Sequence, residues 1–142
     1  MGPPSNKIIF TPEAPKPLGP YSQGVMAGGT LYISGQLGID PETSNFVGNS
    51  ADVQCRQALK NIGGILKAAG GNFEHVVKTT VLLANIADWP AVNSVYAECY
   101  LSEELSCSIC FPSWRIAKGT GIVRVLELTF CRLHIPKMVR RK

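Results

Sequence analysis

The first third of the chain alternates short apolar runs with turn residues, a pattern typical of a meander of strands. We expect strands over residues 7–10, 24–27 and 31–34, because each run is apolar and bounded by glycine or proline. Gly28-Gly29 favours a tight turn before the third strand. The loop between the first two strands contains four prolines: Pro12, Pro15, Pro17 and Pro20.

The spacing of apolar residues becomes helical after Asn49 and Ser50, which suit the N-terminal end of a helix. Apolar residues then recur every three or four positions until Gly70-Gly71 ends the run: Ala58, Leu59, Ile62, Ile65, Leu66 and Ala69. This pattern predicts an amphipathic helix of about five turns.

The second half of the pattern predicts a strand, a helix and a closing strand. Residues 76–83 are rich in β-branched residues, which favours a central strand, and residues 122–133 read as the closing strand. Asp88 and Pro90 open a helix with one apolar side: Val92, Val95, Tyr96 and Cys99. We therefore expect an α+β fold of two layers, with two helices on one face of a mixed sheet. The other face needs cover, which favours oligomerisation.

Length and composition favour one domain. The chain has 142 residues, of which 45% are hydrophobic and 17% charged, so we expect a single domain over residues 1–136 and a basic tail over 137–142. The sequence shows neither an apolar run near the roughly 18 residues of a membrane span nor a secretory signal pattern. We expect a soluble, cytoplasmic protein without a membrane partner; a mitochondrial or nuclear location stays open. The cysteines are odd in number and irregularly spaced, which favours free thiols: Cys55, Cys99, Cys107, Cys110 and Cys131.

The positive charge is concentrated in the last quarter of the chain. Residues 1–104 contain six Lys and Arg against nine Asp and Glu, a net charge of −3, whereas residues 105–142 contain eight against one, a net charge of +7. The basic tail fits a contact with nucleic acid or an import receptor, and it equally fits a solvated chain end.

Two neighbouring segments suggest a small polar pocket. In Gly19-Pro20-Tyr21-Ser22-Gln23, the Gly-Pro pair sets a rigid turn beside two hydroxyl groups. In residues 31–38, a short buried strand ends in glycines, where backbone amides can approach a ligand. The two segments together predict a pocket at the end of this strand.

Together with Lys60-Asn61-Ile62 and residues 78–84, these two segments resemble the Rid (YjgF) family over about residues 7–100. The resemblance implies a chorismate-mutase-like fold and a homotrimer with a barrel-like centre, with pockets in the clefts between subunits. It also implies hydrolysis of small 2-imino acids (2-iminobutanoate and 2-iminopropanoate) to 2-keto acids and ammonia, without a metal or organic cofactor.

The same resemblance assigns candidate site residues. Tyr21 would border the substrate and order water, and Ser34 and Gly35 would contribute backbone groups. Asn93 would lie near the pocket, and Glu127 is the candidate for a functional glutamate on the closing strand. Taken without the resemblance, Tyr21 serves a turn and Asn93 caps or packs on its helix.

The chain departs from the family pattern from about residue 105. The family continues with Pro-x-Arg-x-x-Tyr, whose arginine binds the substrate carboxylate, and Cys107 occupies the arginine position here. A thiol cannot form that charged, bidentate contact. Arg115 and Arg124 are candidate substitutes. Codons allowed for residues 106–118, read one nucleotide out of phase, can encode the missing segment, which suggests a shifted reading frame or a variant exon.

Three alternatives to a competent deaminase remain open from the sequence. The first is an RNA-binding or ribonuclease-like translation inhibitor, which the basic tail supports. The second is a non-catalytic trimer that binds small carboxylates or proteins, which the loss of the arginine supports. The third is a metal or redox site at Cys107-x-x-Cys110, which has the spacing of such a pair but no second pair beside it.

Overall fold

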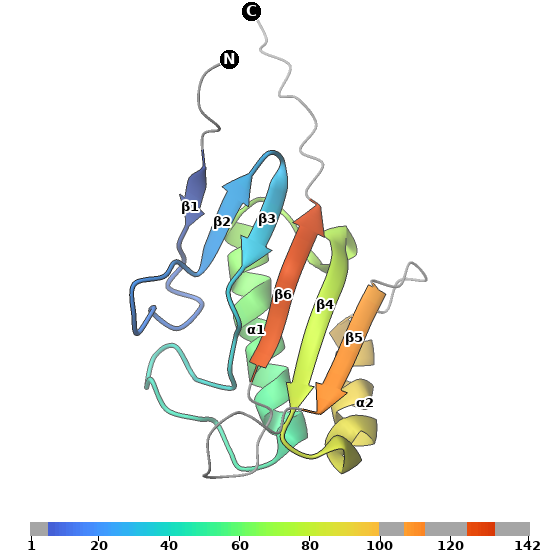
Figure 1. The fold of residues 1–142 in the computed structure, drawn as a ribbon. Helices are drawn as coiled ribbons and strands as arrows, with labels where there is room; N and C mark the ends of the chain where they lie inside the picture. Colours follow the sequence, from blue (N-terminus) through green and yellow to red (C-terminus); the bar gives the residue numbers. More distant parts are fainter. Residues whose placement is uncertain (1–5, 100–106, 113–124, 133–142) are drawn as a thin grey trace, which may run out of the picture.

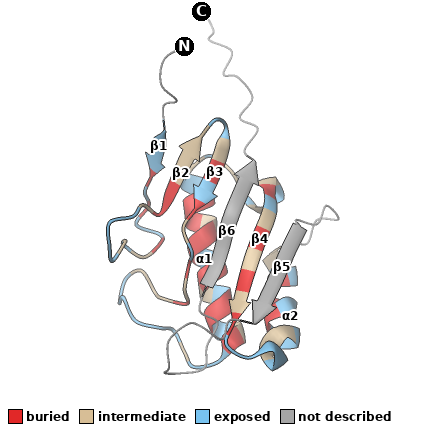
Figure 2. Cartoon of the chain, viewed as in Figure 1, coloured by how far each residue is buried: buried red, intermediate tan, exposed pale blue. Residues whose placement is uncertain are grey.

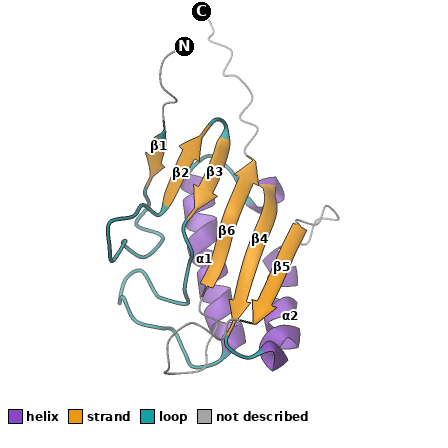
Figure 3. Cartoon of the chain, in the orientation of Figure 1, coloured by secondary structure: helices purple, strands orange, loops and turns teal. Residues whose placement is uncertain are grey.

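The computed structural model describes residues 6–99, 107–112 and 125–132, the last two stretches as backbone strands. In this part of the chain, six strands form one sheet with two α-helices packed on one face (Figures 1 and 3). This arrangement confirms the predicted α+β plan of a mixed sheet with both helices on the same side. The predicted tail over 137–142 lies outside the described residues, so the domain boundary stays a prediction.

The sheet has the strand order β1-β2-β3-β6-β4-β5. An antiparallel meander of β1 (Lys7–Ile9), β2 (Gly24–Ala27) and β3 (Thr30–Ile33) forms one half. β6 (Val125–Arg132) pairs antiparallel with both β3 and β4 (Val76–Leu83). β5 (Cys107–Pro112) pairs parallel with β4 at the other edge.

The expected strands match the observed ones except for β5. The first three agree within one residue at each end, β4 agrees at both ends, and β6 lies inside the expected range 122–133. The predicted element order lacked β5 and was wrong there. The segment has little local strand signal, and its parallel pairing with β4 depends on the intervening helix, which is tertiary context that local pattern does not report.

Helix α1 (Ala51–Ala68) follows the predicted stripe and begins at the expected cap. Ser50 occupies the N-cap position without a capping hydrogen bond; its hydroxyl instead bonds Asp52, which lowers the pKa of that carboxyl. The helix buries its large aliphatic residues almost completely: Leu59, Ile62, Ile65 and Leu66. Figure 2 shows the buried parts of α1 in red. Each such side chain contributes about 1.5–3 kcal/mol of burial free energy.

Helix α2 (Trp89–Cys99) buries the predicted side, namely Val92, Val95 and Tyr96. The Tyr96 hydroxyl hydrogen-bonds the Thr79 hydroxyl of β4, which fastens the helix to the sheet. Two short 3-10 turns, Phe73–His75 and Ile86–Asp88, precede β4 and α2.

The two helices also contact each other near the start of α1 and the end of α2. Arg56 and Glu98 form a bidentate ion pair at the surface. Cys55 beside them is buried, and both Cys55 and Cys99 are free thiols. Burial, with a smaller contribution from neighbouring Cys99, raises the pKa of Cys55 to about 12. None of the helices in the described ranges is long and apolar enough to cross a membrane.

Candidate functional site

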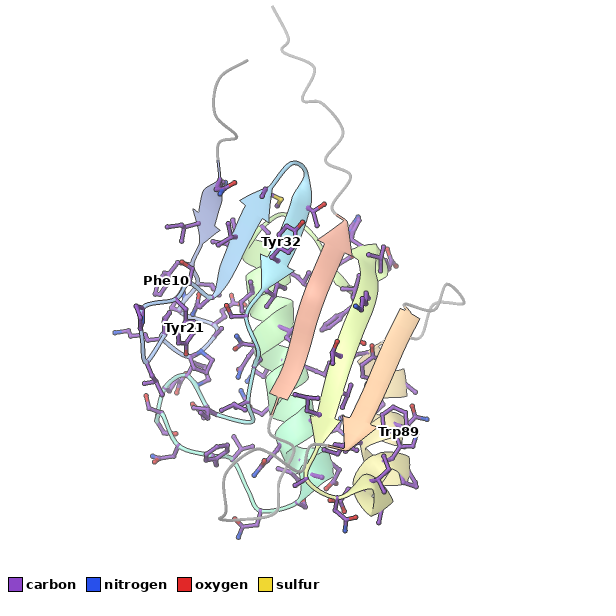
Figure 4. The ribbon with its side chains drawn as sticks, in the orientation of Figure 1. Phe10, Tyr21, Tyr32 and Trp89 are labelled. Carbon is purple, nitrogen blue, oxygen red and sulfur yellow. The ribbon has the colours of Figure 1, made fainter. Side chains whose placement is uncertain are left out.

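A cavity of about 100 Å³ lies between the proline-rich loop and the segment that follows β3. Its walls come from residues 15–23 on one side and residues 35–44 on the other. Ten residues line it: Pro15, Lys16, Leu18, Tyr21, Gln23, Gly35, Gln36, Leu37, Ile39 and Ser44. Figure 4 shows Tyr21 among these loops, beside the β1–β2–β3 half of the sheet. The cavity therefore lies where the two sequence segments predicted a pocket.

Gln23 is the buried tether of the proline-rich loop. Its side-chain oxygen accepts the amide hydrogen of Thr11 at 2.7 Å. Its side-chain nitrogen lies 2.9–3.0 Å from the carbonyl oxygens of Thr11, Ala14 and Pro15. These contacts satisfy backbone groups that would otherwise be buried without partners. A single side chain thus fixes the shape of the loop that forms one wall.

A turn around Pro20 positions Tyr21. The amide of Tyr21 donates to the carbonyl oxygen of Gly19 at 2.8 Å, closing a three-residue turn that suits the fixed φ of proline. The tyrosine hydroxyl accepts the amide hydrogen of Leu18 at 3.3 Å. Within the described residues its own proton has no acceptor, so it is available to a water or ligand in the cavity.

Ser34 fastens the end of β3 to the segment before β2. Its hydroxyl donates to the carbonyl oxygen of Ser22 at 2.6 Å, and its amide donates to the carbonyl oxygen of Gln23 at 3.0 Å. Gly35 follows directly and lines the cavity. Both groups of Ser34 are therefore engaged in holding the wall together, and the adjacent Gly35 presents its backbone to the cavity.

Helix α1 holds the opposite wall in place. The buried Asn61 side chain donates to the carbonyl oxygens of Leu37 and Ile39 at 3.1 and 2.9 Å. Gly38 between them packs so closely on α1 that an added Cβ would lie 2.6 Å from the Cα atom of Gln54. Glycine is required here for that close approach.

Lys16 is the one charged residue among those that line the cavity. It makes no ion pair or hydrogen bond with another described residue, and the lining contains no carboxylate. The remaining walls are largely apolar, with the Tyr21 hydroxyl and side-chain groups of Gln36 and Ser44 as polar exceptions. A cavity of this composition suits a small organic anion.

The structure brings together only part of the predicted site. Tyr21 and Gly35 share the cavity, and Ser34 supports it. Asn93 is exposed on α2, and Figure 4 shows Trp89 at the start of that helix at the opposite edge of the sheet from Tyr21. A single chain therefore does not place Asn93 at this cavity.

The remaining predicted site residues belong to the second half of the chain. Cys107 is the first residue of β5, paired with Lys78, and Glu127 lies in β6, paired with Thr80. Arg115 and Arg124 lie outside the described residues. The structure thus gives a backbone position for Cys107 and Glu127, and their proposed roles stay predictions.

Sequence reasoning gave no role to three residues that shape the cavity. Gln23 directly precedes the apolar run of β2, and Asn61 lies on the apolar side of α1 beside Ile62. Buried amides at such positions commonly bind backbone groups. That signal was available. Lys16 carries no such signal, because a lysine in a proline-rich loop is indistinguishable from a solvated surface residue.

Comparison with known proteins identifies the family. A family model described as endoribonuclease L-PSP matches residues 11–120. The chain belongs to this Rid (YjgF) family. A human relative named 2-iminobutanoate/2-iminopropanoate deaminase is 50% identical over 116 residues, which span 82% of this chain and 84% of the relative.

Solved Rid structures have the same fold. RidA from an Antarctic Psychrobacter superposes with a TM-score of 0.79 at 36% identity, covering 89% of this chain and 98% of that one. TdcF from Escherichia coli, solved with bound serine, gives a TM-score of 0.79 at 28% identity with the same coverage. The fold predicted from the pattern and the resemblance is thus that of the family.

Proposed function

We propose that the protein hydrolyses small 2-imino acids, such as 2-iminobutanoate and 2-iminopropanoate, to 2-keto acids and ammonia. The observation that carries this proposal is the meeting of Tyr21 and Gly35, both assigned as site residues by the family resemblance, in one small cavity whose lining contains no acidic side chain. The name of the human relative, at 50% identity, supports the same activity.

The reaction needs little from the protein beyond positioning. Water adds to the electrophilic C2 of the protonated imine, forming a C–O bond while the C=N electrons move to nitrogen. One proton of the added water passes to the nitrogen, the protonated carbinolamine expels ammonia, and its oxygen becomes the keto oxygen after losing its remaining proton. The Tyr21 hydroxyl, whose proton is free, is placed to hold the attacking water by donating a hydrogen bond. The apolar walls accommodate a short side chain.

The uncovered face of the sheet supports assembly into the trimer that the family resemblance implies. Ile8, Val25 and Tyr32 are partners in register across β1, β2 and β3, and Ile8 is 68% exposed and Tyr32 40% exposed. Both helices lie on the opposite face (Figures 1 and 2). Exposed apolar rows of this kind are typical of interfaces.

We infer that copies of the chain cover this face, in a chorismate-mutase-like trimer with a barrel-like centre. The same assembly would place α2 of one copy, with Asn93, beside the cavity of another. Native mass spectrometry tests it: the expected mass is three times the 15.3 kDa of the chain. An Ile8→Lys variant should shift the mass toward that of the monomer, whereas monomeric wild-type protein would contradict the inference.

Tyr21→Phe tests the chemical proposal, because it removes only the hydroxyl. We expect the release of 2-keto acid from an imino acid generated in situ to fall at least tenfold in kcat, with an unchanged melting temperature. General acid or base groups and positioned water contribute effects of this size or larger. Unchanged kcat in a folded Tyr21→Phe variant would remove Tyr21 from the reaction.

The description of the family model as an endoribonuclease favours one second candidate, cleavage or binding of RNA. Its support within this sequence is the basic cluster over residues 137–142. Salt-sensitive RNA binding that disappears when residues 137–142 are deleted would support it. RNA binding that persists without the tail would assign it elsewhere in the chain.

A further inference from the structure

We propose that Lys16 supplies the cation that binds the substrate carboxylate in the cavity beside Tyr21. This assignment deepens the proposed function, since it names the group that replaces the family arginine, whose position Cys107 occupies. The ligand class it specifies is a small α-keto or α-imino carboxylate, in which the anionic group lies next to the reacting carbon.

The charge distribution in the cavity favours an anion at Lys16. Lys16 is the single charged residue of the lining, and within the described residues no carboxylate competes for its ammonium group. Two acidic residues of the neighbouring loops have partners of their own. Glu13 forms an ion pair with Lys67 at 2.9 Å, and one Asp40 oxygen accepts the amides of Glu42 and Thr43.

The backbone of Lys16 is held in place, which lowers the entropic cost of using a flexible side chain. Pro15 precedes it and Pro17 follows it, so the residue lies between two fixed φ angles and is itself biased to an extended conformation. The carbonyl groups of Ala14 and Pro15 are bound by Gln23. On the other side, the Leu18 amide is bound by the Tyr21 hydroxyl.

Gln23 and Tyr21 thus anchor the chain directly before and after Lys16, and both line the cavity. A carboxylate bound by the ammonium would leave the adjacent carbon in the same small space as the Tyr21 hydroxyl. A lysine ammonium offers three donors and needs no planar, bidentate geometry, so it tolerates this approach from a loop. The arrangement joins carboxylate binding and water positioning within one loop.

The test measures equilibrium binding of 2-oxobutanoate, a stable keto acid of the proposed class, by isothermal titration. Three variants are compared with the wild type. Lys16→Met keeps an unbranched side chain without the charge, and Lys16→Arg keeps the charge. Lys60→Met removes an equally exposed lysine on α1 that does not line the cavity.

We expect affinity to fall at least tenfold in Lys16→Met, to recover to within about threefold of the wild type in Lys16→Arg, and to be unchanged in Lys60→Met. The uncharged 2-oxobutanamide should bind wild type and Lys16→Met equally. Equal affinity of Lys16→Met and wild type for 2-oxobutanoate, or no wild-type binding at millimolar concentration, would overturn the assignment. Weakening by Lys60→Met as large as that by Lys16→Met would also overturn it, because the effect would then reflect net charge.

The outcomes separate this inference from the proposed function. Binding through Lys16 without keto acid release would keep the carboxylate site and remove the deaminase activity. Keto acid release with the same kcat and KM in wild type and Lys16→Met would keep the activity and remove Lys16. An increase in KM at unchanged kcat in Lys16→Met supports both.

Discussion

The two edges of the sheet are built by different means. At the β1–β2–β3 edge, buried amides bind backbone groups of two loops and enclose a cavity. At the edge formed by α2 and β5, the links are an apolar helix face and a surface ion pair, and Asn93 is exposed. Among the described residues, one edge encloses a cavity within a single chain, whereas the other leaves Asn93 exposed at the surface. The difference explains why Tyr21 and Gly35 meet within one copy and Asn93 does not join them.

The largest effect should come from Gln23→Leu, which removes the tether of the first edge. Several buried backbone groups would lose their partner, so we expect the free energy of unfolding to fall by about 3–5 kcal/mol. Affinity for 2-oxobutanoate should disappear with the shape of the loop. Urea unfolding and titration measure the two effects.

Gln57→Leu is the matched control, because the Gln57 side chain on α1 donates a single hydrogen bond within the described residues, to Asn61. Its cost should be about 1 kcal/mol. If both variants lost the same stability, the special role of Gln23 would be refuted.

Gly64→Ala should have the next largest effect, because Glu13 packs against α1 at this glycine. An added Cβ would lie 2.8 Å from the Cβ atom of Glu13 and 3.2 Å from its carbonyl oxygen. We expect a loss of about 1–3 kcal/mol in urea unfolding, together with weaker ligand binding.

The neighbouring Gly63→Ala provides the control for helix propensity. Its added Cβ would lie 3.3 Å from the Phe73 ring, away from the loop. We expect a change of at most about 1 kcal/mol and unchanged ligand binding. Equal ligand affinity for Gly64→Ala and Gly63→Ala would argue that the contact at Glu13 does not shape the cavity.

Cys107→Arg probes the second edge, because it places an arginine at the start of β5, where the family resemblance predicts the carboxylate-binding arginine. We expect kcat/KM for the imino acid to rise by about tenfold, equivalent to about 1.4 kcal/mol, when a second cation joins Lys16. Steady-state kinetics of wild type and variant measure it. A folded variant with unchanged kcat/KM would show that β5 does not contribute to the substrate site.

The smallest effect concerns Cys55 at the junction of the helices. Burial raises the pKa of its thiol from 9.0 to about 12, so above pH 9 the unfolded thiol ionises while the folded one stays protonated. This contribution to stability is complete below pH 9 and is lost as pH rises toward 12, by up to about 1.4 kcal/mol per pH unit. Cys55→Ala should show a correspondingly flatter pH profile in urea unfolding. Parallel profiles for the two proteins would contradict the assignment.

The apolar pattern predicted the elements whose burial decides their structure. Helix α1 and strand β4 follow directly from the positions of Ile62, Ile65 and Val81, all fully buried. β5 was missed because its pairing is decided by the neighbouring strand. The motif predicted Tyr21 and Gly35 at one pocket, but the backbone groups that Gln23 and Asn61 bind lie in distant segments, which local spacing does not encode. Lys16 was missed because a lysine between two prolines has no distinguishing pattern.

The family model matches residues 11–120, so it extends past residue 105, where the sequence pattern predicts a departure from the family. The predicted departure has a separate test in the coding DNA. If the frame shifted by one nucleotide encodes Arg-Ala-Ala-Tyr near codon 107, the shifted-frame hypothesis is supported. A coding sequence without that segment in either alternative frame would remove it. The outcome bears on strands β5 and β6, since the residues that line the cavity all lie between positions 15 and 44.

The central claim is that this cavity supports imine hydrolysis in the assembled protein. The most direct measurement is the release of 2-oxobutanoate from 2-iminobutanoate generated in situ, on a sample whose mass is determined at the same time. We predict release above the uncatalysed rate from a trimer, and loss of that release in Tyr21→Phe. If a well-folded trimer leaves the imino acid to decay at the same rate as in buffer without protein, the proposed imine hydrolysis is contradicted.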